Sequence, residues 1–279
     1  MKTSFRGLGK LMVAVVLLSA GSFVATASAD HSWGGYHWAR TANPFTLNLG
    51  DNMTSVWDVY LTASSLDWNE SAELETAVVA GMANPKTCKA VNGRVEVCNS
   101  KYGRNGWLGI ASVWVSGSHI TKATTKLNDT YFNTAKYNTP AWKQLVVCQE
   151  IGHTFGLDHQ DEIFDNLNLG TCMDYTNDPD GALFGQLDNQ HPNLHDYEEL
   201  GLIYAHLDTI DTALNGVFGN KSLALAMTGG ADRESDEVDT SDSAQWGRVV
   251  RKSGDGRSSL HEKDLGNGKK LFTFVVWAE

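Results

Sequence analysis

Hydrophobic and polar residues alternate in parts of the chain and recur at helical spacing in others. The alternation of Phe, Thr, Leu, Asn and Leu over 45–49 predicts a β-strand, because successive side chains of a strand point to opposite faces. Apolar residues three and four positions apart predict one helix within 52–69 and a final helix over 193–207. Runs with β-branched and aromatic residues predict further strands over 74–80 and 107–115.

A polar strand and a well-marked helix follow. Residues 119–127 contain scattered threonines between charged residues, which predicts an exposed strand. Thr139 and Pro140 are typical of a helix start, with Thr as the N-cap and Pro in the first turn. We expect this helix to continue to Thr154 and to end at Gly156.

The composition changes after residue 208. Acidic side chains mixed with Gly, Ser and Thr predict a solvated linker over 209–244. Two strands joined through glycine-rich turns are expected over 245–279. The sequence therefore predicts an α+β domain over 30–208 followed by an acidic linker and a small β appendage.

The first 29 residues have the features of a secretory signal peptide. Three positive charges precede an apolar run too short to span a membrane comfortably, and residues 27–29 read Ala-Ser-Ala, a small-x-small cleavage pattern. This leader (1–29) carries no negative charge, so its removal changes the formal net charge from −11 to −14. We expect a secreted, extracellular, acidic protein that has no membrane segment after cleavage.

Composition excludes several classes of protein. With 42% hydrophobic residues the chain can bury a sizeable core, which excludes a wholly disordered protein. The net charge of −11 provides no excess of positive charge to neutralise phosphates, so nucleic acid is not an expected partner.

Four cysteines in an exported chain predict disulfides, and three pairings are open. Asn92-Gly93 is a strong hairpin signal and would bring Cys88 opposite Cys98. We therefore expect Cys88–Cys98 and Cys148–Cys172. A zinc-thiolate site is disfavoured because the sequence has no Cys-x-x-Cys.

The residues that carry chemistry lie at the end of the 140–154 helix. Gln149 and His153 are four apart and share one helix face, and Glu150 lies next to that face. Gly156 permits a sharp turn that returns His159 toward His153. Two imidazoles and a third donor suit a catalytic Zn²⁺ with an open position for water, and Glu150 is the expected base.

This segment resembles the H-E-x-x-H-x-x-G-x-x-H motif of the metzincin zinc metalloproteases. Four of its five defining positions are present, at Glu150, His153, Gly156 and His159. Residues 172–175, with Met173, resemble the Met-turn of the same family. The resemblance covers about 44–208 and is nearest to matrixin-like secreted bacterial enzymes. It implies a mixed twisted sheet, an active-site helix, a Met-turn beneath the metal and a closing helix.

One residue departs from the motif, because Gln149 stands where the family has its first histidine. Three interpretations stay open. Gln149 binds zinc through its amide oxygen; or His191, His195 or Tyr175 completes the ligand set; or zinc binding is impaired and the protein is non-catalytic.

Tyr175 follows Met173 by two residues, as a tyrosine does in the astacin and serralysin branches. The resemblance implies that it assists catalysis by hydrogen bonding to the oxyanion, and a core tyrosine beneath the site is the alternative. A substrate is expected to add as a strand to an exposed sheet edge, with 119–127 the candidate edge. Acidic residues crowd the loops near the site, and they form either a Ca²⁺ site or a solvated surface: Asp158, Asp161, Glu162, Asp165, Asp174, Asp178 and Asp180.

The sequence thus predicts a secreted zinc-dependent endopeptidase, expected to be monomeric, with a peptide or protein as its substrate. The alternative is a non-catalytic zincin-fold protein that binds peptides or proteins.

Overall fold

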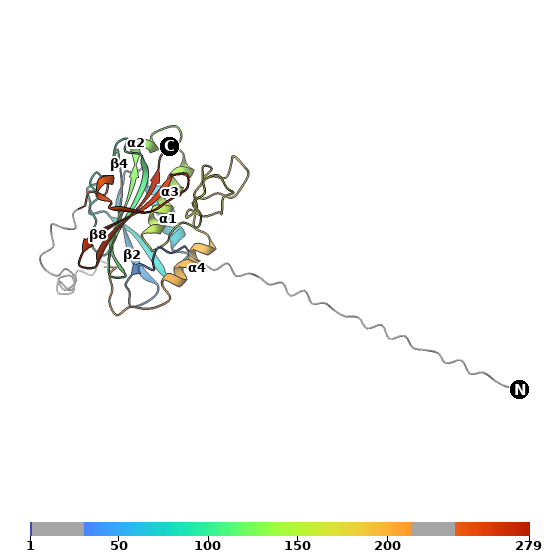
Figure 1. Cartoon of the computed structure of the whole chain (residues 1–279), viewed down its shortest axis with the longest axis horizontal. Coiled ribbons are helices and arrows are strands. Elements are labelled where there is room, and N and C mark those ends of the chain that lie inside the picture. Colours follow the sequence, from blue (N-terminus) through green and yellow to red (C-terminus); the bar gives the residue numbers. More distant parts are fainter. Residues whose placement is uncertain (2–30, 214–237) are drawn as a thin grey trace.

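The computed structural model describes residues 1, 31–213 and 238–279, which form a mixed sheet with helices packed against it (Figure 1). Its strands are β1 (His37–Trp38), β2 (Phe45–Asn52), β3 (Leu74–Ala80), β4 (Val95–Ser100), β5 (Trp107–Ser116), β6 (His119–Asn128), β7 (Arg248–Lys252), β8 (Ser258–Gly266) and β9 (Lys269–Trp277). Its helices are α1 (Asp58–Trp68), α2 (Asp129–Phe132), α3 (Pro140–His153) and α4 (Leu194–Ile203), with a 3-10 turn η1 (Ser243–Gln245).

The described strands form a single sheet in the order β3-β2-β4-β6-β5-β9-β8-β7, with β1 beside β6. Strands β1, β2, β3, β4 and β6 pair in parallel, and β5 runs antiparallel between β6 and β9. The mixed sheet and few helices agree with the broad α+β prediction.

Helices α1, α3 and α4 form where the sequence predicted them, with shorter bounds, whereas the short helix α2 was not predicted. Helix α3 begins after Thr139, whose side chain accepts a hydrogen bond from the Trp142 backbone, and Pro140 occupies the first turn. Helix α4 begins with a capping box between Asn193 and Asp196. Helices α1 and α3 pack on each other and on the sheet (Figure 1).

The prediction of an exposed edge strand over 119–127 is wrong. Strand β6 lies inside the sheet, between β4 and β5, and its polar residues over 124–128 are buried. The Lys126 amine donates a hydrogen bond to the Ser241 hydroxyl at 2.8 Å and lies over the Tyr102 ring. Burial lowers the pKa of Lys126 to about 8. The polar residues of this strand are not a sign of solvent exposure, because other parts of the chain supply their hydrogen-bond and ring partners.

The C-terminal strands do not form a separate appendage. Strand β9 pairs antiparallel with β5, from Trp107 opposite Trp277 to Ser116 opposite Lys269, and Figure 1 shows these red strands beside the green ones. Strand β8 was not predicted. Phe272 and Phe274 on β9 are buried in the main core, which explains why this segment joins the sheet.

Both predicted disulfides are present, Cys88–Cys98 and Cys148–Cys172. The hairpin expected between the first pair does not form. Strand β4 pairs in parallel with β2 and β6, and the chain from 88 to 94 reaches it as a loop. The predicted signal peptide lies outside the described residues, as does 214–237 of the predicted linker.

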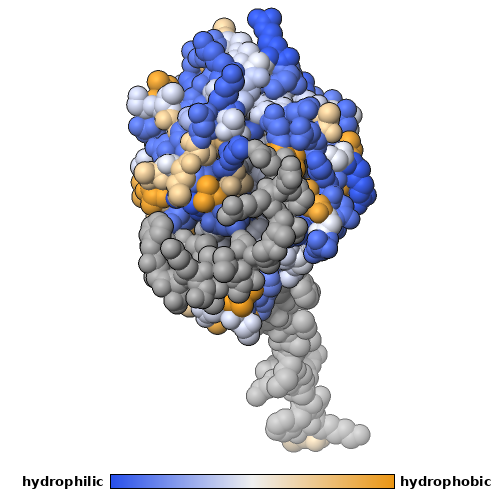
Figure 2. Space-filling model, turned by 90° about the vertical axis from the view of Figure 1, so that its left-hand side faces the viewer, coloured by the Kyte–Doolittle hydropathy of each residue, from blue (hydrophilic) through white to orange (hydrophobic). Residues whose placement is uncertain are grey.

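Among the described residues, no helix is both long and apolar enough to cross a membrane. Figure 2 shows the face that is on the left in Figure 1, and where atoms are coloured it is mainly hydrophilic, with limited hydrophobic areas.

Candidate metal and catalytic site

The end of α3 is held by the N-terminal segment. The indole N–H groups of Trp33 and Trp38 donate hydrogen bonds to the carbonyls of His153 and Thr154, at 3.1 and 2.8 Å. The chain then reverses at Gly156, whose φ is +105°. A Cβ at this position would lie 2.4 Å from the Tyr36 carbonyl oxygen, so only glycine fits the turn.

This turn brings His153 and His159 together. Their Nε2 atoms are 2.9 Å apart, and the two rings are nearly perpendicular, at 84°. The Nδ1 of His153 lies 2.9 Å from the Leu157 carbonyl and must donate to it, which leaves Nε2 free of a proton in the neutral ring. Burial, followed by the neighbouring His159, holds the pKa of His153 well below its usual range.

Acidic side chains orient His159 from its other side. Its Nδ1 lies 3.5 Å from an oxygen of Asp158 and 3.4 Å from an oxygen of Glu162. Ligand atoms of these three residues fall within 4.8 Å of one another. A carboxylate behind a ligating histidine fixes the orientation of the ring and raises its basicity.

Glu150 is fully buried one turn before His153 on α3. Neither of its carboxylate oxygens has a hydrogen-bond partner among the described residues. Burial raises the pKa of Glu150 well above its usual range. The carboxyl lies against the backbone of β5, because a Cβ at Gly109 would be 2.6 Å from its Oε1. A buried carboxyl without partners is costly, which marks a group kept for interaction with something bound there.

Gln149 is also buried, and its side-chain amide donates a 2.8 Å hydrogen bond to the Cys172 carbonyl. The Cys148–Cys172 disulfide joins the same two segments covalently. Met173 is fully buried under α3, since a Cβ at Gly152 would lie 2.5 Å from its sulfur. The segment predicted to resemble a Met-turn therefore lies directly beneath α3, the helix that ends at His153.

Tyr175 packs beside His159, with ring centroids 4.3 Å apart. Its hydroxyl is buried without a hydrogen-bond partner among the described residues, and burial raises its pKa well above the usual range. The other two candidate ligands are engaged elsewhere. His191 lies 2.7 Å from an oxygen of Asp67, and His195 stacks on His31.

The acidic loop residues make contacts of their own. Asp178 accepts hydrogen bonds from the backbone of Leu183 and Phe184, and Asp161 accepts from Ile163 and Asn166. These hydrogen bonds stabilise the loops around Asp161 and Asp178. The Ca²⁺ site expected from the sequence stays a prediction.

The C-terminal strands cover this site, which sequence reasoning did not anticipate. The Phe274 ring of β9 stacks on His153 at 4.1 Å, with 11° between the planes. Arg251 of β7 donates to Asp158 at 2.6 Å and to Glu162 at 2.9 Å. A hollow of about 170 Å³ occurs elsewhere, at the start of α3 beside Pro179. The two histidines thus lie beneath the C-terminal strands.

Comparisons with known proteins identify no family from the sequence. No protein-family model matches the chain, and no curated protein does. Among solved structures, the chain is similar to high choriolytic enzyme 1, a hatching enzyme zinc-protease from the medaka fish Oryzias latipes. That similarity has 8% identity and a TM-score of 0.36, and it covers 62% of this chain and 96% of the enzyme. At that TM-score it carries no functional conclusion, so function has to be inferred from the side chains.

Proposed function

We propose that this chain is a secreted zinc-dependent endopeptidase of the metzincin type. The observation that carries the proposal is the convergence of the Nε2 atoms of His153 and His159 at the end of the helix that bears Glu150. The unpartnered, buried carboxyl of Glu150 supports it, because such a group suits a general base that acts on bound water.

The residues present fit a zinc ion. His153 and His159 would hold it through their Nε2 atoms, with the ring of His159 oriented by Asp158 and Glu162. Zinc, when bound, supplies Lewis-acid chemistry that polarises a carbonyl and acidifies water. The nitrogen of the Gln149 amide is engaged by the Cys172 carbonyl, so a metal bond from Gln149 would come from its oxygen.

The protein's own residues then perform the proton transfers. Glu150 takes a proton from the attacking water and passes it to the leaving amine of the peptide. Its raised pKa, caused by burial, favours a carboxyl that holds the proton between these two transfers. In this proposal the buried Tyr175 hydroxyl, beside His159, donates a hydrogen bond to the developing oxyanion.

Access to the site requires movement of the C-terminal strands. Strand β9 pairs along the antiparallel edge of β5, and Phe274 lies on His153. A peptide that reaches the histidines has to displace this cover, so we expect the chain to work through an opened state. The matrixin-like subtype, export and the monomeric state stay predictions from the sequence.

The test uses the full chain, its zinc content and hydrolysis of a denatured protein substrate. We expect Glu150→Gln to keep zinc and to lose turnover by roughly 10²-fold or more, the scale of general acid–base catalysis. Glu199→Gln is the matched control, because Glu199 is also buried on a helix with an unpartnered oxygen. His159→Ala is expected to lose the zinc held at this site together with the activity.

A non-catalytic zincin-fold protein is the rival function, favoured by Gln149 at a ligand position and by the cover over the site. Zinc binding without cleavage, both in the parent chain and in an Arg251→Ala variant with a weakened cover, would decide for this rival. Restored cleavage in Gln149→His would identify Gln149 as its cause. Absence of zinc from every variant would overturn the enzyme proposal.

A further inference from the structure

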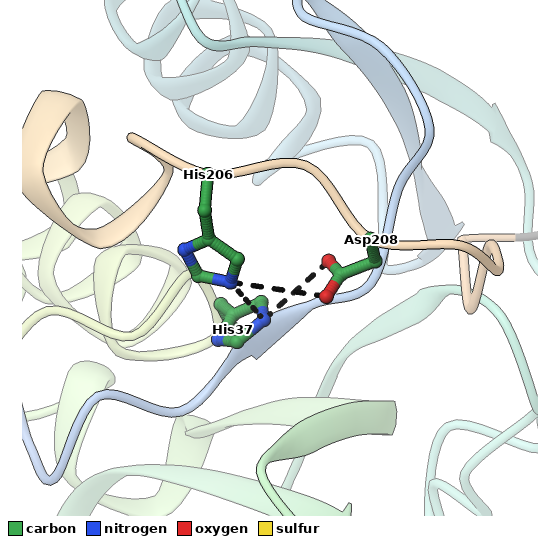
Figure 3. Close-up of side chains that lie close together, drawn as sticks. All are labelled: His37, His206 and Asp208. Carbon is green, nitrogen blue, oxygen red and sulfur yellow. Dashed lines mark hydrogen bonds and ion pairs between the residues drawn. The ribbon is translucent and has the colours of Figure 1, made fainter.

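A second group of histidines lies where the N-terminal segment meets the end of α4 (Figure 3). His37 belongs to β1 and stands opposite His119 of β6 in the parallel register. His206 and Asp208 follow α4, and 169 positions separate His206 from His37. Parts of the chain that are distant in sequence thus bring three imidazoles and a carboxylate together.

The ligand atoms of this group face one another. The Nε2 atoms of His37 and His206 are 3.1 Å apart, and the carboxylate oxygens of Asp208 lie 3.5 Å from the first and 3.8 Å from the second. Figure 3 shows the two rings and the carboxylate directed toward one space. Tetrahedral ligands at about 2.0–2.1 Å from a zinc ion stand about 3.4 Å from each other, so these separations suit one ion.

The buried histidine is held in the form that can ligate. The Nδ1 of His37 lies 2.9 Å from the Gly35 carbonyl and donates to it, so Nε2 of the neutral ring carries a lone pair.

The carboxylate is also held in place. His119 lies 3.2 Å from one oxygen of Asp208, and the Arg40 guanidinium lies 3.0 Å from the other. Arg40 also donates to the Tyr204 and His206 carbonyls, which fixes the backbone that carries His206. The charge of Arg40 opposes a cation, so the affinity is expected to be below that of a site without it.

We propose that His37, His206 and Asp208 form a second divalent-metal site that takes Zn²⁺, with His119 as a positioning residue for Asp208. Two imidazoles and one carboxylate match the ligand preference of zinc and offer too few oxygens for Ca²⁺. The His206 side chain is 55% exposed, so an ion can enter from solvent and keep a water ligand. The bound ion would tie β1 to the segment after α4.

This site is independent of the proposed catalytic site, because the two share no ligand. A hydrogen bond between the His37 and His206 rings, with no metal, is the competing explanation of the 3.1 Å contact. The experiment therefore has to count zinc ions at each site separately.

The test measures zinc per chain in the full-length protein after removal of free metal, with Zn²⁺ alone as the probe. The variants are His206→Ala, His159→Ala and the control His191→Ala. His191 is a suitable control because its side chain is 53% exposed and pairs with one carboxylate, Asp67. We expect His206→Ala to lose one zinc per chain relative to the parent and His191→Ala to lose none.

A second readout does not depend on stoichiometry. Added zinc is expected to raise the thermal unfolding midpoint of His159→Ala, which keeps only the second site, and to raise it less in a His159→Ala/His206→Ala double variant. Equal zinc content in the parent, His206→Ala and His191→Ala would overturn the second site, whatever happens in His159→Ala. Loss of zinc from His159→Ala alone would leave the proposed catalytic site standing and remove this one.

Discussion

The ring of Phe274 lies flat on the imidazole of His153, with the centroids 4.1 Å apart and 11° between the planes. Phe274 is 1% exposed and belongs to a strand that also pairs with β5. The aromatic face therefore covers a histidine that we propose as a metal ligand. One face of the His153 ring is therefore closed to an ion or substrate.

Replacement of Phe274 by leucine tests this cover. Phe274→Leu keeps an apolar side chain of similar volume, so we expect a loss of about 1 kcal/mol in the free energy of unfolding. The flat contact with His153 is lost, and zinc uptake by the chain is expected to become faster. Stopped-flow uptake with a zinc indicator measures the rate.

Phe272→Leu is the control for this variant. Phe272 lies on the same strand and is also buried, but it packs against Trp33 and Tyr36. We expect a similar loss of stability and an unchanged uptake rate. Equal acceleration in both variants would show that general loosening of β9, and not the ring on His153, sets the rate.

Arg251 holds β7 against the loop that follows α3. Its bonds to Asp158 and Glu162 are charge-assisted, but its side chain is 39% exposed, so we expect about 1–2 kcal/mol from them together after allowance for solvent screening. Arg251→Ala is then expected to speed amide hydrogen exchange in β7–β9 roughly 5–30-fold. Arg248→Ala removes a pair between β7 and Glu262, away from the site, and should leave exchange in β9 unchanged.

The two disulfides permit a matched comparison. Cys148–Cys172 closes 24 residues and Cys88–Cys98 closes 10, and chain-entropy arguments give each a contribution of about 3 kcal/mol. We expect the two Cys→Ala double variants to lose similar stability in urea unfolding. Zinc affinity at His153 should fall only in Cys148→Ala/Cys172→Ala, because that bond joins α3 to the Met173 segment. Equal affinity in both variants would mean that packing alone positions the site.

Asp174 gives the protein a specific pH dependence. Burial raises the pKa of this carboxyl to about 6, although Leu169 and Asn189 donate hydrogen bonds to it. In the unfolded state an aspartate has a pKa near 3.9, so as pH rises the unfolded chain loses this proton at a lower pH than the folded chain does. The stability from this group is therefore present below about pH 4 and is lost as pH rises to about 6, by up to about 3 kcal/mol.

Asp174→Asn is expected to remove this dependence. Urea unfolding between pH 4 and pH 7 should show the variant gaining stability relative to the parent as pH rises. Asp188→Asn, at an exposed carboxylate of the same region, should follow the parent curve. A constant difference between parent and Asp174→Asn across this range would contradict the assignment.

Local patterns predicted the elements that lie next to the site. The Thr139-Pro140 start, the two histidines and Gly156 were enough to place α3 and its turn, because these signals act within a few residues. The predictions of a hairpin between Cys88 and Cys98 and of an exposed strand over 119–127 failed for a different reason. Burial of β6 depends on β4 and β5 on either side and on Ser241, none of which is encoded near Lys126.

The cover and the second histidine group could not be predicted from spacing. Phe274 meets His153 only because β9 selects β5 as its partner, a long-range choice with no local signal. His206 and Asp208 stand two apart just after a helix end, which is a weak signal, and His37 is far away in sequence. Only the assembled fold shows that these side chains meet.

The β5–β9 pairing also sets the order in which the molecule can be completed. Strand β5 is synthesised long before β9, so during synthesis it stays without its second neighbour. Loop closure between such distant segments makes folding slow, and an unpaired strand edge invites association with other chains. A polypeptide that stops before Lys269 would present the buried side chains of β5 to its surroundings. We therefore expect prematurely terminated chains to aggregate or to be degraded, and the histidine pair to be assembled and covered in one late folding step.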